Sequence, residues 1–179
     1  MTTIPKAMRL LYKKRLNSIY DGNISHKKSS SRSFVISPGS VRKHTIQDEE
    51  LVLVKTREDD TLSWDIGKKP SREEMLHSLS LFDTDDELYV VHCHPPNILR
   101  FIRDNDLRDI KTTFPEIEYN IGENVNYYTA GSERLAKETH HKLKGNDIIA
   151  LEKHGVVGKG KDLLKIVDMI EVIDFYCNI

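Results

Sequence analysis

The chain has 179 residues, which is enough for one well-filled domain and too few for two comfortable ones. Apolar residues make up 38% and charged residues 31%, a composition typical of a water-soluble globular protein rather than a disordered one. The formal net charge of −1 gives no general reason to expect binding to nucleic acid or to an acidic membrane surface, and no apolar stretch is long enough to span a bilayer.

The start of the chain and its cysteines indicate a cellular compartment. The opening residues MTTIPKAMRLLYKKRL lack the apolar core of a signal peptide. Cys93 and Cys177 form neither a Cys-x-x-Cys pair nor a disulfide framework. We therefore expect a single domain over residues 1–179 in the reducing cytoplasm.

The first predicted element is a helix that Pro5 opens as its first residue. Gly22, in the sequence DGN, is its expected reversal point. Its apolar face is expected to consist of Met8, Leu11, Tyr12 and Ile19. The basic, serine-rich segment HKKSSSRS at 26–33 predicts a turn, and the apolar runs SFVIS and ELVLVKT predict strands.

The segment KPSREEMLHSLSLF predicts a second helix. Ser71 is a suitable N-cap, and Glu74, three residues later, would complete a capping box. The expected buried stripe consists of Met75, Leu79 and Phe82.

The rest of the chain alternates strands and helices. ELYVVHC predicts a strand, PPNILRFIRD a short helix, and GSERLAKETHHKLKG a helix with Ser132 as cap and Gly145 as stop. DIIALEKHG predicts a buried strand before a closing helix, KDLLKIVDMIEVIDFY, whose inward residues are Leu163, Ile166, Ile170 and Ile173. Loose alternation of this kind predicts an α/β domain with a mixed sheet covered by helices.

Three histidines lie at predicted strand ends. His92 and His94 are two residues apart and so project from the same face of their strand, while Cys93 points the other way. His154 follows the strand DIIALE and precedes a glycine. These side chains are either exposed strand-end and loop histidines or the three ligands of an open metal site, which would leave a position for substrate or water.

A carboxylate and three turns add to this pattern. Glu73 lies one turn before His77 and is either a functional carboxylate or one favoured by the helix dipole. DGNISHK, ISPGSVRK and KKPSRE each combine glycine or serine with a nearby lysine or arginine, and such turns expose N–H groups and hydroxyls to anions. Together with a metal site, they suggest a phosphorylated substrate.

Five segments, in order, resemble the motifs of the class II aldolase/adducin family: GNIS, FVISPGSV, KPSREEMLH, VVHCHP and ALEKHGVVGKG. The resemblance runs from about Leu10 to the C-terminus. It implies a single α/β/α domain and a homotetramer with active sites at subunit interfaces. It also implies one divalent metal per chain, commonly Zn²⁺, with Mn²⁺ or Co²⁺ as alternatives.

The resemblance also implies residue roles. His92, His94 and His154 match the metal ligands, and Glu73 matches the carboxylate that can bind the metal at rest and act as proton-transfer base. Tyr119, in EIEYNIG, matches a tyrosine that acts as general acid. The implied phosphate cradle consists of Gly22, Asn23, Gly39, Ser40, Ser71 and Arg72.

The implied activity is that of a metal-dependent aldehyde-lyase. Such an enzyme cleaves a ketose 1-phosphate of the L-fuculose-1-phosphate type into dihydroxyacetone phosphate and an aldehyde, through a metal-stabilised enediolate. A methylthioribulose-1-phosphate dehydratase-like enzyme and a non-catalytic adducin-like binding module remain as alternatives. Glu73 favours cleavage because the dehydratase branch lacks this carboxylate, and the three histidines favour an enzyme over a binding module.

The sequence departs from the family pattern in three places. In SPGS the glycine and the small polar residue stand in the opposite order to the commoner TPSG or TPTG. Arg72 replaces a serine and would strengthen a phosphate contact. The sequence ends at Ile179, just after the last predicted helix, so we expect no tail with a second active-site tyrosine.

Overall fold

The computed structural model describes residues 3–59 and 61–179. A seven-stranded sheet with the order β4-β3-β2-β1-β5-β7-β6 forms its centre. The strands are β1 Asn23–Lys27, β2 Ser33–Ile36, β3 Val52–Thr56, β4 Leu62–Trp64, β5 Leu88–Cys93, β6 Ile148–Leu151 and β7 Gly155–Gly160. The pairings between these strands are antiparallel, and isolated parallel bridges join Ile121 to Ile148 and Val125 to Leu151.

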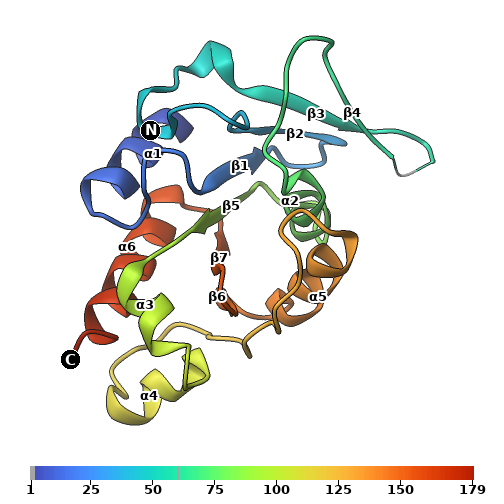
Figure 1. Cartoon of the computed structure of the whole chain (residues 1–179). Coiled ribbons are helices and arrows are strands. Elements are labelled where there is room, and N and C mark those ends of the chain that lie inside the picture. The colour runs from blue at the N-terminus through green and yellow to red at the C-terminus, as the bar shows by residue number, and fades with distance from the viewer. Residues whose placement is uncertain (1–2, 60) are drawn as a thin grey trace.

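Helices cover both faces of the sheet. The α-helices are α1 Ile4–Lys13, α2 Glu74–Leu81, α3 Pro96–Phe101, α4 Ile110–Thr113, α5 Glu133–Leu143 and α6 Leu163–Tyr176, and the 3₁₀ turns are η1 Lys43–Thr45, η2 Asp48–Glu50 and η3 Leu107–Asp109. Figure 1 shows α1, α3 and α6 on one side of the central strands and α2 and α5 on the other. Within the described residues, no helix has both the length and the apolarity that a membrane span needs.

The central strand β5 divides the core into two layers, because its side chains alternate between the faces of the sheet. Tyr89, Val91 and Cys93 pack in the cluster that includes residues of α1, α3 and α6. Leu88 and Val90 pack with residues of α2 and α5. This arrangement confirms the predicted α/β/α fold class.

Several predicted elements lie where the sequence pattern indicated. SFVIS, ELVLVKT, ELYVVHC and DIIALE contain β2, β3, β5 and β6. Ser132 caps α5 by accepting a hydrogen bond from the backbone N–H of Leu135 at 3.2 Å, and Gly145 beyond its end has φ +75°. The four inward residues predicted for α6 are all buried.

The first helix is shorter than predicted. It ends at Lys13 rather than near Gly22, because Arg15 adopts a left-handed conformation with φ 60° and the N–H of Leu16 donates to the carbonyl of Leu11 at 2.9 Å. This is a Schellman-type ending without its usual glycine. Ile19 therefore lies in the loop that follows, and Tyr12, although it is within the helix, is exposed rather than part of the apolar face.

The capping box predicted for the second helix is wrong. α2 begins at Glu74, and Glu73, at the N-cap position, makes no side-chain capping bond. The hydroxyl of Ser71 instead accepts a hydrogen bond from the distant Asn23 at 2.9 Å. The predicted buried stripe is also shifted: Met75 is exposed and Leu76 is buried in its place, while Leu79 and Phe82 are half-buried.

Three strands were not predicted. β1 includes His26 and Lys27, which had been assigned to the serine-rich turn, and β4 forms the edge of the sheet. β7 is the glycine-containing segment GVVGKG, and it lies between β5 and β6. Its position determines how the histidines meet.

Candidate active site

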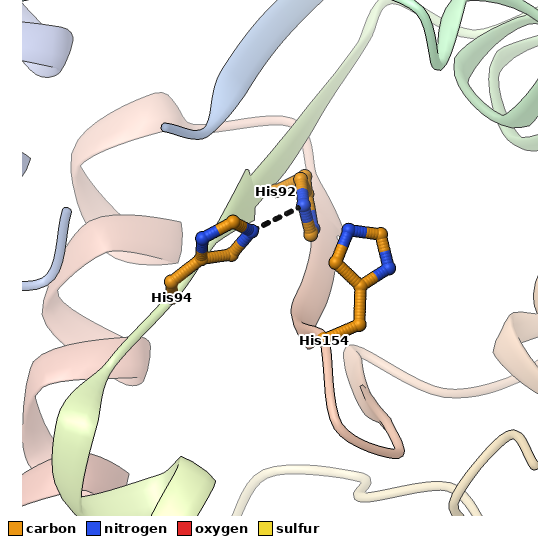
Figure 2. A group of neighbouring side chains, drawn as sticks. All are labelled: His92, His94 and His154. Carbon is orange, nitrogen blue, oxygen red and sulfur yellow. Dashed lines mark hydrogen bonds between the residues drawn. The ribbon is translucent and has the colours of Figure 1, made fainter. Parts of the chain in front are cut away.

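Three imidazoles converge at one end of the central strands. His92 is in β5, His94 is the first residue after β5, and His154 lies in the turn between β6 and β7. β7 pairs directly with β5, and Cys93 lies opposite Val156, so the β6–β7 turn is next to the end of β5. Figure 2 shows the three rings pointing toward one another, and one ligand atom from each can be chosen so that all three lie within 4.8 Å of one another.

This close approach depends on Gly155. A Cβ atom at this position would lie 2.4 Å from the carbonyl oxygen of Cys93 and 2.9 Å from Cε1 of His92. Both separations are shorter than real contacts allow. The glycine after His154 is thus needed for the imidazoles to come together.

The geometry of the imidazoles fits a metal site. Nδ1 of His92 donates to the carbonyl of Val156 at 2.9 Å, which leaves Nε2 with a free lone pair and is a common way to orient a ligand histidine. That Nε2 lies 3.0 Å from Nε2 of His94. Ligand atoms about 2.0–2.1 Å from a tetrahedral zinc ion are about 3.3–3.4 Å apart, so the nitrogens need little movement to bind one ion.

The protonation states also suit a metal. Burial lowers the pKa of His92, and it lowers the pKa of His94 to about 4, where repulsion by His92 and His154 adds to the effect. Both imidazoles are therefore neutral at pH 7. A metal ligand must be in this form.

Glu73 lies against the same group. Its side chain is buried, with 5% of the residue exposed, and its two carboxylate oxygens lie 3.2 Å from Nε2 of His154 and 3.3 Å from Nε2 of His92. Burial alone would raise the pKa of Glu73. The attraction of His92 and His154 and a hydrogen bond from Asn23 outweigh burial and hold this pKa well below its usual range. Glu73 is therefore ionised beside the imidazoles.

A buried network orients Glu73. Asn23 donates from Nδ2 to Glu73 at 3.1 Å, and its Oδ1 contacts Nε2 of His77. An amide oxygen can only accept, so Nε2 of His77 carries the proton, and its Nδ1 accepts from the hydroxyl of Ser25 at 2.5 Å. His77 thereby fixes which end of the Asn23 amide faces Glu73. The sequence placed His77 only on the same helix face as Glu73.

The residues predicted for a phosphate cradle are brought together. They line one cavity of about 230 Å³ with Glu73 and the histidines, and they are Gly22, Asn23, Gly39, Ser40, Ser71 and Arg72. This volume is below the roughly 300–1,000 Å³ of drug-sized sites and suits a small polar ligand.

The unusual order of SPGS has a structural reason. Gly39 donates from its N–H to the carbonyl of Lys69 at 2.9 Å, and Pro38 forms an isolated bridge with Pro70. A Cβ on Gly39 would lie 2.6 Å from the carbonyl oxygen of Pro70, so only glycine permits this contact. Ser40 takes the left-handed conformation, with φ 58°. The reversed order thus joins two of the three predicted anion-binding turns.

Lys43 was not predicted as a site residue. It lines the same cavity although only 4% of the residue is exposed, and its ammonium donates to the carbonyl of Pro38. Burial lowers its pKa to about 8, against the attraction of Glu73 and Asp21. The only sequence signal was a lysine close after a glycine-serine turn, which is common on protein surfaces.

Tyr119 is not brought to this cavity within one chain. It lines a separate cavity with Asp147 and Lys159, and its backbone carbonyl accepts a hydrogen bond from Lys111 at 3.0 Å. The other predicted site residues converge.

Comparison with known proteins gives a consistent result. The family model described as "Class II Aldolase and Adducin N-terminal domain" matches residues 2–179. The chain is 29% identical over 177 residues to an L-fuculose phosphate aldolase of Methanocaldococcus jannaschii, covering 94% of this chain and 88% of the relative. Among solved structures, an L-fuculose 1-phosphate aldolase matches with a TM-score of 0.78 and 19% identity, covering 98% of this chain and 83% of the other. A sugar-phosphate aldolase from Thermotoga maritima matches with a TM-score of 0.77 and 21% identity, covering 98% and 90%.

Proposed function

The chain belongs to the class II aldolase and adducin N-terminal domain family, and from this premise we propose that it is a metal-dependent aldehyde-lyase. Its proposed reaction is the retro-aldol cleavage of a ketose 1-phosphate of the L-fuculose-1-phosphate type. The products are dihydroxyacetone phosphate and an aldehyde.

One observation carries this proposal. The buried, ionised carboxylate of Glu73 lies 3.2 Å and 3.3 Å from two of the three converging imidazoles, in the cavity that the glycine and serine turns also line. Cleavage of a carbon–carbon bond beside a carbonyl needs an electron-withdrawing centre and a group that exchanges a proton. A binding module needs neither.

The residues have the following roles in the proposed reaction. A divalent metal, Zn²⁺ or alternatively Mn²⁺ or Co²⁺, held by His92, His94 and His154 would supply a Lewis acid for the carbonyl oxygen of the substrate. The cradle turns bind the phosphate, and so position a bond remote from it. When the C3–C4 bond breaks, its electron pair stays on C3, and the proton of the C4 hydroxyl passes to a base at that oxygen to give the aldehyde. Glu73 takes up a proton from water and delivers it to C3, which completes dihydroxyacetone phosphate.

The proposal includes assembly as a homotetramer with sites at subunit interfaces. Tyr119 lies at a separate cavity within one chain. Its proposed role at the C4 oxygen, taking the proton in cleavage and returning it as general acid in the reverse reaction, therefore requires a second copy of the chain. A mass measurement in solution tests the assembly, and a monomer at micromolar concentration would contradict it.

The activity is tested with a panel of ketose 1-phosphates that includes L-fuculose 1-phosphate. The zinc-loaded protein should release dihydroxyacetone phosphate, which is measured by its enzymatic reduction with NADH. Removing the zinc with a chelator should abolish this release until zinc is restored. Loss of water from methylthioribulose 1-phosphate would instead indicate the dehydratase. If the zinc-loaded protein turned over none of these compounds, the binding module would be the better interpretation.

A further inference from the structure

A buried lysine in the cavity has unused hydrogen-bonding capacity. An ammonium group has three N–H donors. Among the described residues, that of Lys43 makes one hydrogen bond, to the carbonyl of Pro38, although only 4% of the residue is exposed. Unpaired donors of a buried cation are costly, so the remaining donors need an acceptor inside the cavity.

The position of Lys43 is set by the backbone. Its N–H donates to the carbonyl of Ile19 at 2.9 Å, which ties η1 to the loop that leads into Gly22. Its side chain reaches back to Pro38, the residue before Gly39 and Ser40. The ammonium is therefore held where the glycine-serine turn faces the cavity.

The surrounding charges leave this lysine short of negative charge. Burial lowers the pKa of Lys43 to about 8. The negative charges of Glu73 and Asp21 favour the protonated lysine and act in the opposite direction, but they do not outweigh burial. His77 is buried and neutral, and the other cations lining the cavity, Lys69 and Arg72, are exposed to solvent. A dianion in the cavity would supply both the missing acceptor and the missing charge.

We propose that Lys43 is the phosphate-binding cation of this site, donating from its ammonium to the substrate phosphate held between the Gly39–Ser40 turn and Ser71. The proposal rests on the proposed function for the identity of the substrate. Because Lys43 is buried, solvent screens its charge less than the charges of Lys69 and Arg72. Lys43 therefore contributes more to phosphate affinity than either.

Anion binding by the zinc-loaded protein tests this without turnover. Inorganic phosphate and sulfate are titrated calorimetrically into the wild-type protein, Lys43→Gln and Lys43→Met. Loss of a charged hydrogen-bond donor should weaken binding roughly ten- to hundredfold. Arg42→Gln removes the same charge from the adjacent, exposed residue, which does not line the cavity, and should leave the dissociation constant unchanged within about twofold. Equal affinities for wild type and both Lys43 variants would overturn the proposal, and would mean that the anion binds elsewhere, for example at the metal.

A second measurement needs only the wild-type protein and so does not depend on how the variants fold. Sulfate is a dianion throughout the range around pH 8, so any proton taken up on binding is gained by the protein and supplied by the buffer. A lysine with a pKa of about 8 is about half deprotonated at pH 8, so sulfate binding should take up as much as about half a proton. Calorimetry in buffers of different ionisation enthalpy measures this uptake, and its absence would contradict the role of Lys43.

The two proposals fail in different ways. Phosphate binding that depends on Lys43, with no cleavage of any ketose 1-phosphate, supports this inference and removes the lyase. Cleavage of a ketose 1-phosphate with phosphate binding independent of Lys43 keeps the lyase and removes this inference.

Discussion

Replacing Glu73 by glutamine tests the proposed chemistry most directly. The substitution keeps the size of the side chain and an oxygen that can accept from Asn23, but it removes the negative charge and the proton acceptor. General acid–base catalysis is typically worth about 10²–10⁴-fold, so turnover at saturating zinc should fall by that order. Because the carboxylate lies 3.2 Å and 3.3 Å from two imidazoles, zinc affinity should also fall by at least about tenfold.

Two assays separate these effects. Competition with a coloured chelator gives the zinc affinity of each variant. Exchange of the C3 hydrogen of dihydroxyacetone phosphate in deuterated water, followed by NMR, reports the proton transfer alone and needs no aldehyde. With zinc in excess, Glu73→Gln should still bind the metal while losing both the exchange and the cleavage.

Glu74→Gln is the matched control. Glu74 is the next residue, is only partly buried, and is absent from the residues that line the cavity. Its substitution should change turnover by less than about twofold. Near-wild-type exchange in zinc-saturated Glu73→Gln, or an equal loss in the two variants, would show that Glu73 is not the base.

Two further predictions concern the supports of the site. Gly155→Ala places a Cβ 2.4 Å from the carbonyl of Cys93 and should cost about 1–3 kcal/mol in urea unfolding and at least about tenfold in zinc affinity. Gly160→Ala, in the same strand as Gly155, is its control: the added Cβ would lie 3.3 Å from a side-chain carbon of Ile166 in α6, so the substitution should cost less in both. Burial lowers the pKa of His77 to about 3, so at pH values between there and about 6.5 the unfolded chain binds more protons. The contribution of His77 should therefore make the wild-type protein less stable as the pH is lowered through this window. The stability difference between wild type and His77→Gln should move in favour of the variant as the pH falls, and a difference that stays constant would contradict the buried neutral state.

The sequence predicted which residues lie together at the site better than the elements that bring them together. The spacing of His92 and His94 at a strand end was enough to place two imidazoles on one face, because strand geometry is local. The position of His154 could not be predicted in the same way, because it depends on the pairing of β7 with β5. The glycines of β7 favoured a turn over a strand. Gly155 is in β7 because the backbones of β5 and β7 approach too closely for a side chain. Glycine is needed at this position only because the two strands pair, and strand pairing cannot be read from the local sequence.

The other differences have the same origin in long-range contacts. Ser71 carries a typical N-cap signal, but its hydroxyl is bonded to Asn23, which is far away in sequence. Lys43 looks like a surface lysine, and only the packing of η1 against the loop before β1 buries it. Local propensity describes what a residue can do alone. These side chains are committed to partners that the fold brings to them.

The register of three central strands explains why these contacts form one site. Asn23 of β1 lies opposite His92 of β5, and His92 lies opposite Val157 of β7, so one row across the sheet carries both the amide that orients Glu73 and a proposed metal ligand. A shift of one residue between β1 and β5 would turn the side chain of Asn23 to the opposite face. Glu73 would then lose its amide donor while every site residue remained in the sequence. Hydrophobic alternation keeps this register, since Ile24 must pack with the layer of α1 and α6 while Val90 packs with α2 and α5. The apolar residues of these strands therefore position the residues of the proposed active site.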